Sequence, residues 1–97
     1  MDIVPSILLK AAETFRERGR VYGCAYKNYN GQVLKVLFPN GVKLETELDF
    51  NRYAALNAIV AKLGRYCNNW ENGGHKDSAH DIINFAAMLE EFCDENS

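Results

Sequence analysis

The sequence predicts an all-α fold in which four helices form a single helical domain over residues 1–97. Three observations lead to this prediction. Apolar residues recur every three or four positions along the longer stretches, which is the spacing of one helix face. Glycine and proline residues break the chain between those stretches. The length and the 47% hydrophobic content suit one core that needs no metal or disulfide.

The first helix is indicated by an amphipathic N-terminal stretch. Pro5 suits its first turn, because the N–H group that proline lacks would have no partner there. We predict a helix over residues 5–18 that ends at Gly19. Tyr22 follows, and its large ring with a polar tip can line a pocket or close a small core. The apolar face of this helix comprises Ile3, Val4, Ile7, Leu8, Ala11, Ala12 and Phe15.

The segment 29–46 fits two structures. Residues 33–38 and 42–46 have the pattern of two short strands joined by an Asn-Gly turn. Val33, Leu34 and Leu37 also share one face of a short helix that Pro39 would end. We predict the helix followed by a turn, because no further strand is available to extend a sheet and a lone hairpin is weak. A short β-hairpin at 33–46 is the alternative.

Two longer helices follow and are joined by a glycine turn. Thr46 and Asp49 mark the start of the first, which we expect to run to Trp70. Residues 71–74, Glu-Asn-Gly-Gly, break it and offer glycines for left-handed backbone. The last helix is expected to begin near Asp77 or Ser78 and to pack antiparallel to its neighbour. The stripe predicted to be buried on the long helix is Leu56, Ile59, Val60, Leu63, Cys67 and Trp70.

Polar side chains on facing sides of these two helices form the candidate site, which we call the polar seam. At about 100° per residue, each helix gathers its polar members on one face. Counting outward from Gly73 places Arg65 level with Asp81, and Asn69 near the start of the last helix. The polar seam comprises Lys62, Arg65 and Asn69 on the long helix, Asp77, Asp81 and Asn84 on the last helix, and His75 at its mouth.

The chemistry of the polar seam fits a nucleotide with a divalent cation. Asp77 and Asp81, one turn apart, are candidate ligands for Mg²⁺, which prefers oxygen and keeps several waters. Lys62 and Arg65 are candidate phosphate contacts, and the start of the last helix adds N–H groups for an anion. The alternative is structural, with Arg65 and Asp81 forming a salt bridge between the helices.

Charge, cysteines and motifs exclude several other classes of function. The net charge of −2, with mixed signs, argues against binding duplex nucleic acid, which needs a basic stripe. The three cysteines, with His75 and His80, match no structural zinc spacing, so we expect reduced thiols. The sequence contains no phosphate-binding loop and no activated nucleophile, so we assign no catalytic residue. Without a signal peptide or a membrane-spanning stretch, we expect a cytoplasmic protein.

Six short motifs follow one another along the chain: Phe15-Arg16-Glu17-Arg18, Tyr22-Gly23, Leu37-Phe38-Pro39-Asn40-Gly41, Lys62-Leu63-x-Arg65-Tyr66, Gly74-His75-x-Asp77-Ser78-x-x-Asp81 and Phe85-Ala86-Ala87-Met88-Leu89. In this order and spacing they resemble a family of small uncharacterised proteins from tailed phages and prophages. The resemblance spans residues 9–91. That family is similar, more distantly, to the MazG-like all-α nucleoside triphosphate pyrophosphatases. Those are helical, usually dimeric enzymes that bind Mg²⁺ with acidic residues on two facing helices and release monophosphate and pyrophosphate.

The resemblance implies a phage-encoded accessory protein in the cytoplasm of the host cell. It implies a homodimer that binds, or weakly hydrolyses, a nucleotide or nucleotide-like signal, with Asp81 at the position of the metal-binding aspartate. Lys62 and Arg65 stand where the enzymes carry an acidic pair, so we expect binding rather than full catalysis. Arg18 and Tyr22 are expected to close the base end. The alternative is a non-enzymatic phage inhibitor that binds a host protein, such as a component of an anti-phage defence system.

Overall fold

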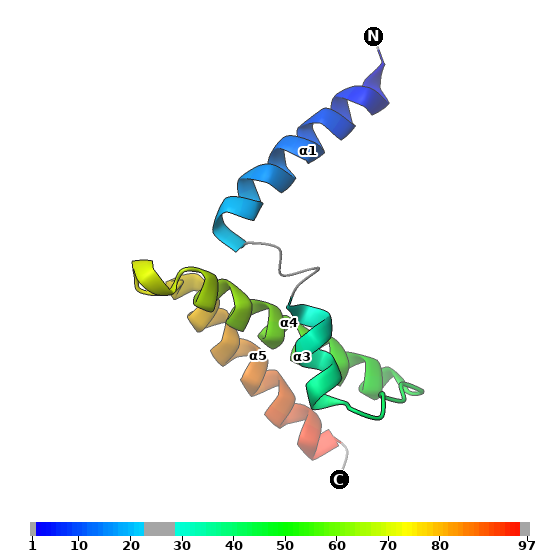
Figure 1. The fold of residues 1–97 in the computed structure, drawn as a ribbon. Helices are drawn as coiled ribbons and strands as arrows, with labels where there is room; N and C mark the ends of the chain where they lie inside the picture. Colours follow the sequence, from blue (N-terminus) through cyan, green and yellow to red (C-terminus); the bar gives the residue numbers. More distant parts are fainter. Residues whose placement is uncertain (1, 23–28, 96–97) are drawn as a thin grey trace.

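The computed structural model describes residues 2–22 and 29–95, and helices make up most of this part of the chain (Figure 1). The all-α prediction is confirmed. The described ranges contain no strand, so the predicted helix and turn are right for segment 29–46 and the hairpin is wrong. The elements are α1 (Ile3–Tyr22), α3 (Asn30–Leu37), α4 (Glu47–Asn68), the 3₁₀ turn η1 (Trp70–Asn72) and α5 (Lys76–Glu95).

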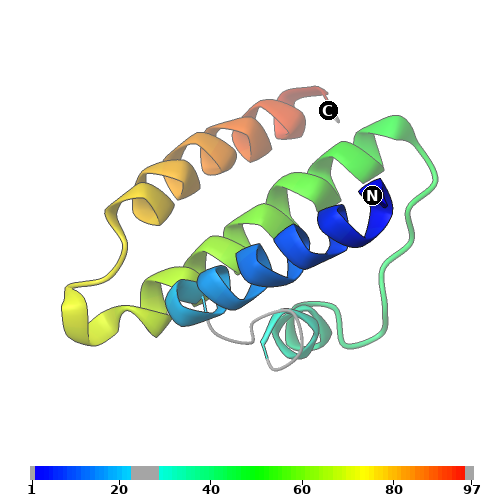
Figure 2. The ribbon, with the colours of Figure 1, turned by 90° about the horizontal axis from the view of Figure 1, so that it is seen from above.

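The antiparallel pair of α4 and α5 is the frame of the molecule. Seen from above, the two helices run side by side in opposite directions, as the short turn predicts (Figure 2). The short helix α3 lies across α4 (Figure 1). Gly64 permits this contact, because a Cβ atom there would lie 2.7 Å from Cε2 of Tyr29. Burial against α4 raises the pKa of the Tyr29 phenol above its ordinary value.

A capping box starts α4. The Thr46 hydroxyl accepts a hydrogen bond from the backbone N–H of Asp49 at 3.1 Å. In return, the Asp49 carboxylate accepts hydrogen bonds from the backbone N–H groups of Thr46 and Glu45, each at 3.1 Å. These backbone N–H groups stabilise the charged carboxylate and hold the pKa of Asp49 below its ordinary value of 3.8.

Two glycines reverse the chain between α4 and α5. Gly73 and Gly74 have φ angles of 92° and 91°, in the left-handed region that side chains disfavour. The N–H of Gly74 donates to the carbonyl of Asn69 at 2.8 Å, which ties the turn to the end of α4. The ring of Tyr66 lies directly over Gly74 and occupies the space that a Cβ atom would need. The turn therefore needs glycine at position 74 for two separate reasons.

The buried core is small. Two predictions from the sequence are wrong: the burial of Leu63 and Trp70, and the end of the first helix at Gly19. Among the described residues, Ala55 and Val60 are the only fully buried apolar side chains. Trp70 is 69% exposed and Leu63 is 45% exposed, because none of the helices in the described ranges covers that end of the predicted stripe. The first helix also continues past Gly19 to Tyr22, since a glycine inside a helix costs only about 1 kcal/mol relative to alanine.

Helix α1 contacts α4 and extends away from the other helices (Figure 1). Every residue from Asp2 to Gly19 is exposed. The predicted apolar face of this helix is therefore largely open to solvent. None of the helices in residues 2–22 and 29–95 combines the length and the apolar character that crossing a bilayer requires.

We expect Gly74→Ala to destabilise the fold more than Gly73→Ala. Both substitutions force alanine into left-handed backbone, which costs roughly 1 kcal/mol. Only the Cβ atom at position 74 also meets the Tyr66 ring, because the space around position 73 is open. Urea unfolding of the two variants measures the difference, which we expect to be about 1 kcal/mol or more. Equal losses would show that Tyr66 yields freely.

We expect the capping box to make α4 sensitive to acid. The pKa of Asp49 is lower in the folded chain than in the unfolded chain. Its stabilising effect is therefore complete above pH 3.8 and is lost as the pH falls through the folded pKa. Asp49→Asn should flatten the pH dependence of stability in this window, measured by circular dichroism. Glu47→Gln removes an exposed carboxylate in the same turn and should leave the profile unchanged.

Candidate functional site

One ion pair joins the two walls of the polar seam. The Lys62 amine lies 3.1 Å from a carboxylate oxygen of Asp81, which connects α4 to α5. The Lys62 side chain is 20% exposed and that of Asp81 is 42% exposed, so the pair is partly shielded from water. The sequence placed Arg65, not Lys62, level with Asp81. Arg65 is three residues further on and about 60° round the helix from Lys62, and Lys62 is the cation that faces Asp81.

Arg65 and Asn69 meet at the end of α4. The Asn69 side-chain amide donates to the Arg65 carbonyl at 2.8 Å, and both residues are half-buried. The Asn69 carbonyl in turn accepts the N–H groups of Asn72 and Gly74. Asn69 thus builds the turn, in addition to lying near the start of α5 as the sequence suggested. The Arg65 side chain remains on the same wall of the seam as Lys62.

His75 and Ser78 organise the first turn of α5. Nδ1 of His75 and the Ser78 hydroxyl share a hydrogen bond of 2.6 Å, and Ser78 is only 1% exposed. His75 is half-buried, so it is part of the packed start of the helix and not a freely exposed loop residue. The sequence predicted a start near Asp77 or Ser78, and α5 begins at Lys76.

The remaining predicted site residues lie further from this cluster. Asp77 and Asn84 are exposed on α5 and share one side of the helix, about 20° apart. Arg18 is exposed near the C-terminal end of α1. The Tyr22 side chain lies outside the described part of the structure. The structure therefore brings Lys62 and Asp81 together, places Arg65, Asn69, His75 and Ser78 near the same end of the helix pair, and does not place Tyr22.

The cluster can hold a cation only with help from a ligand or water. No group of three His, Cys, Asp or Glu side chains lies close enough for metal binding within residues 2–22 and 29–95. Mg²⁺ is commonly held by one or two carboxylates together with waters and substrate phosphates. Asp81, with Asp77 one turn away, suits that arrangement better than it suits an all-protein cage.

The structure also contains a hollow that the sequence did not indicate. It has a volume of about 140 Å³ and lies where α3, the 42–44 segment and α4 meet, with Phe38, Leu44, Tyr53 and Leu89 among its walls. The rings of Phe38 and Tyr53 lie 6.2 Å apart beside it. Ligand pockets usually measure about 300–1,000 Å³, so this hollow is too small for a nucleotide. The sequence signal for this hollow was a pair of aromatic residues, Phe38 next to Pro39 and Tyr53 within α4.

Comparison with family models, with curated proteins and with solved structures finds no match to this chain. The resemblance to phage proteins and MazG-like pyrophosphatases therefore depends on the motifs in the sequence. Several of those motif residues gather at one end of the α4–α5 pair, including Lys62, Asp81 and the hydrogen-bonded His75 and Ser78.

We expect the Lys62–Asp81 pair to stabilise the helix pair modestly. A double-mutant cycle of Lys62→Ala and Asp81→Ala should give a coupling of about 1 kcal/mol in urea unfolding. Asp81→Ala alone should cost more than Lys62→Ala alone, because it leaves the more buried partner without its counter-charge. Additive losses would show that the two charges act independently.

Proposed function

We propose that the polar seam binds a nucleotide or a nucleotide-like signal through its phosphates. The observation that carries this proposal is the partly shielded ion pair between Lys62 and Asp81, set at the N-terminal half of α5. A cation and a carboxylate held together between two helices are the two groups that a phosphate with its Mg²⁺ would need. Arg65, about one turn further along α4, supplies a second cation that can bind phosphate as a fork.

Binding would exchange partners within a balanced set of charges. In the free protein, Asp81 neutralises Lys62. With the ligand present, the Lys62 amine would bind a phosphate oxygen and the Asp81 carboxylate would take the Mg²⁺ that the phosphate carries. No charge is left without a partner in either state, which matters because an unpaired, partly buried charge is costly. Asp77, exposed one turn before Asp81, would reach the same cation from the open side.

The proposed function is binding, with at most weak hydrolysis of the ligand. Lys62 and Arg65 stand where the resemblance implies acidic residues, so the second half of a metal cage is missing. The proposed role is that of a phage-encoded accessory protein that senses or sequesters a nucleotide in the host cytoplasm. The homodimer that the resemblance implies remains a prediction, and Arg18 and Tyr22 remain candidates for the base end of the ligand.

We expect calorimetric titration with nucleoside triphosphates and Mg²⁺ to show binding at millimolar concentration or tighter. Lys62→Ala should raise Kd about tenfold or more, because it removes a charge-assisted hydrogen bond worth about 1.5–3 kcal/mol. Lys43→Ala is the matched control, since Lys43 also forms an ion pair, at 3.0 Å with Glu45, but is highly exposed and belongs to the loop before α4. If no nucleotide gives a measurable heat of binding at millimolar concentration, the proposal is wrong.

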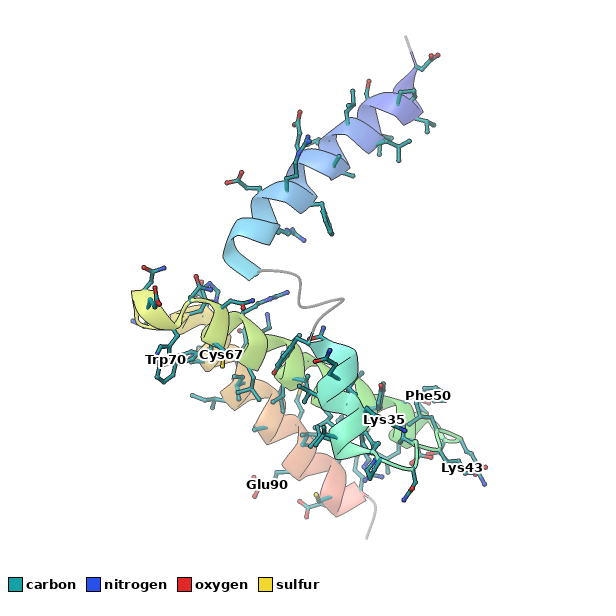
Figure 3. All side chains as sticks on the ribbon, in the orientation of Figure 1. Lys35, Lys43, Phe50, Cys67, Trp70 and Glu90 are labelled. Atoms are coloured by element: carbon teal, nitrogen blue, oxygen red, sulfur yellow. The ribbon has the colours of Figure 1, made fainter. Side chains whose placement is uncertain are left out.

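A second candidate function is the binding of a host protein by a non-enzymatic phage inhibitor. It is favoured by the exposure of Leu63, Cys67 and Trp70, which recur at helical spacing. Figure 3 shows Cys67 and Trp70 toward the η1 end of the α4–α5 pair. Tryptophan is among the residues that contribute most to protein interfaces. A stoichiometric host partner that stays bound to the Lys62→Ala and Asp81→Ala variants would favour this function over nucleotide binding.

A further inference from the structure

The folded chain exposes more surface than a protein of its size normally does. Its accessible surface is 7667 Å². A folded monomer of 11.0 kDa is expected to expose about 5,600 Å². The radius of gyration is 16.5 Å, whereas about 12–13 Å is expected for a compact domain of this length. The excess surface, about 2,000 Å² by this scaling, indicates that the single chain leaves a large area to be covered.

Helix α1 accounts for one part of this excess. Its large apolar side chains are between 59% and 72% exposed. At 100° per residue, six apolar positions fall within an arc of about 140°. That arc is wider than the narrow seam of a two-helix coiled coil and suits a helix that packs against two neighbours. The six positions are Ile3, Val4, Ile7, Leu8, Ala11 and Phe15.

The reverse side of the α4–α5 pair accounts for another part. Leu63 and Cys67 lie about 100° and 140° round α4 from Lys62, so they point away from the polar seam. Ile83 lies about 200° round α5 from Asp81 and is 66% exposed, so it also faces away from the seam. Trp70 continues the α4 side of this surface into η1. We call Leu63, Cys67, Trp70 and Ile83 the apolar reverse face.

We propose that α1 of a second copy of this chain covers the apolar reverse face, and that two copies exchange their α1 helices in a two-fold dimer. The exchange covers both exposed surfaces of each chain in one closed, self-complementary contact. Stable homodimers bury roughly 1,000–2,500 Å² per chain, and the excess surface of about 2,000 Å² lies in that range. Two neighbouring helices, α4 and α5, provide the pair of contacts that the wide arc of α1 requires.

Charge does not oppose this pairing. Helix α1 carries four cations, Lys10, Arg16, Arg18 and Arg20, and two anions, Glu13 and Glu17, so its formal charge is +2. Helix α5, which it would cover, carries one lysine and six carboxylates, so the two helices have opposite net charge. Leu63 and Cys67 point about 100° and 140° away from Lys62 on α4, so a helix packed on them leaves the Lys62 side of the pair uncovered. The proposal is therefore independent of whether the seam binds a nucleotide.

The test compares two neighbouring leucines on α1 by light scattering after gel filtration. The unmodified chain should elute with twice its mass of 11.0 kDa. Leu8→Glu places a charge within the apolar arc and should weaken the dimer at least a hundredfold. Leu9→Glu is the matched control, since Leu9 is equally exposed but lies on the opposite side of α1, and this variant should remain a dimer.

A complementation experiment distinguishes the exchanged dimer from a dimer in which the α1 helices of two chains pack against each other. Ile83→Glu damages the apolar reverse face and should also give monomers. An equimolar mixture of Leu8→Glu and Ile83→Glu chains should form a mixed dimer, because the intact α1 of one fits the intact face of the other. If Leu8→Glu chains lose helicity when they separate, recovery of the circular dichroism signal on mixing with Ile83→Glu chains reports the same exchange.

Four results would overturn the proposal. The first is an unmodified chain that stays monomeric at about 0.1 mM, well above the roughly micromolar to picomolar range in which interfaces of standard size associate. That result would mean that α1 folds back on its own chain or binds another protein. The second is a Leu8→Glu dimer as tight as that of Leu9→Glu. The third is an Ile83→Glu chain that dimerises like the unmodified chain. The fourth is a mixture of the two damaged variants that stays monomeric.

Discussion

The close approach of α4 and α5 is the constraint on which the rest of this structure depends. Two left-handed glycines turn the chain within a few residues, and the Tyr66 ring closes over the second of them. The turn sets the register of the two helices, and the register brings Lys62 opposite Asp81. A loop of a different length would shift α5 along α4. A shift by one helical turn, about 5.4 Å, would separate those two charges. Backbone geometry at position 74 thus determines the composition of the polar seam.

The same helix pair has two sides of opposite character. One side carries charges that satisfy one another, and the other carries large apolar residues that are mostly exposed to solvent. Such an arrangement allows one side to serve a polar ligand while the other serves a protein surface. The two roles do not compete for side chains, because they lie on different faces of α4 and α5.

Much of the fold could be predicted from the sequence because local signals and the final structure agree. The helical spacing of apolar residues gave α3, α4 and α5, and Thr46 with Asp49 marked a helix start that a capping box fixes. The glycine pair indicated the reversal before α5. The length of α1 was underestimated at Gly19, since one unfavourable residue does not outweigh the turns that continue beyond it.

The candidate site was only partly predictable, for two physical reasons. Helix counting gives the face of a residue but not the offset between two helices, and so Arg65 was placed opposite Asp81 where the structure places Lys62. Burial depends on what lies across from a residue, and an apolar stripe cannot show whether its cover comes from the same chain. Trp70 and Leu63 follow the pattern of a core helix and are nevertheless exposed.

The packing of Tyr29 on Gly64 has a consequence for the internal motions of the protein. An aromatic ring set on bare backbone shields the peptide groups near the C-terminal end of α4 from water. Those amides can exchange their hydrogens with solvent only after the ring moves aside, which requires α3 to lift from its seat. Opening of the C-terminal turns of α4 is thereby tied to departure of α3, so the two form a single cooperative unit.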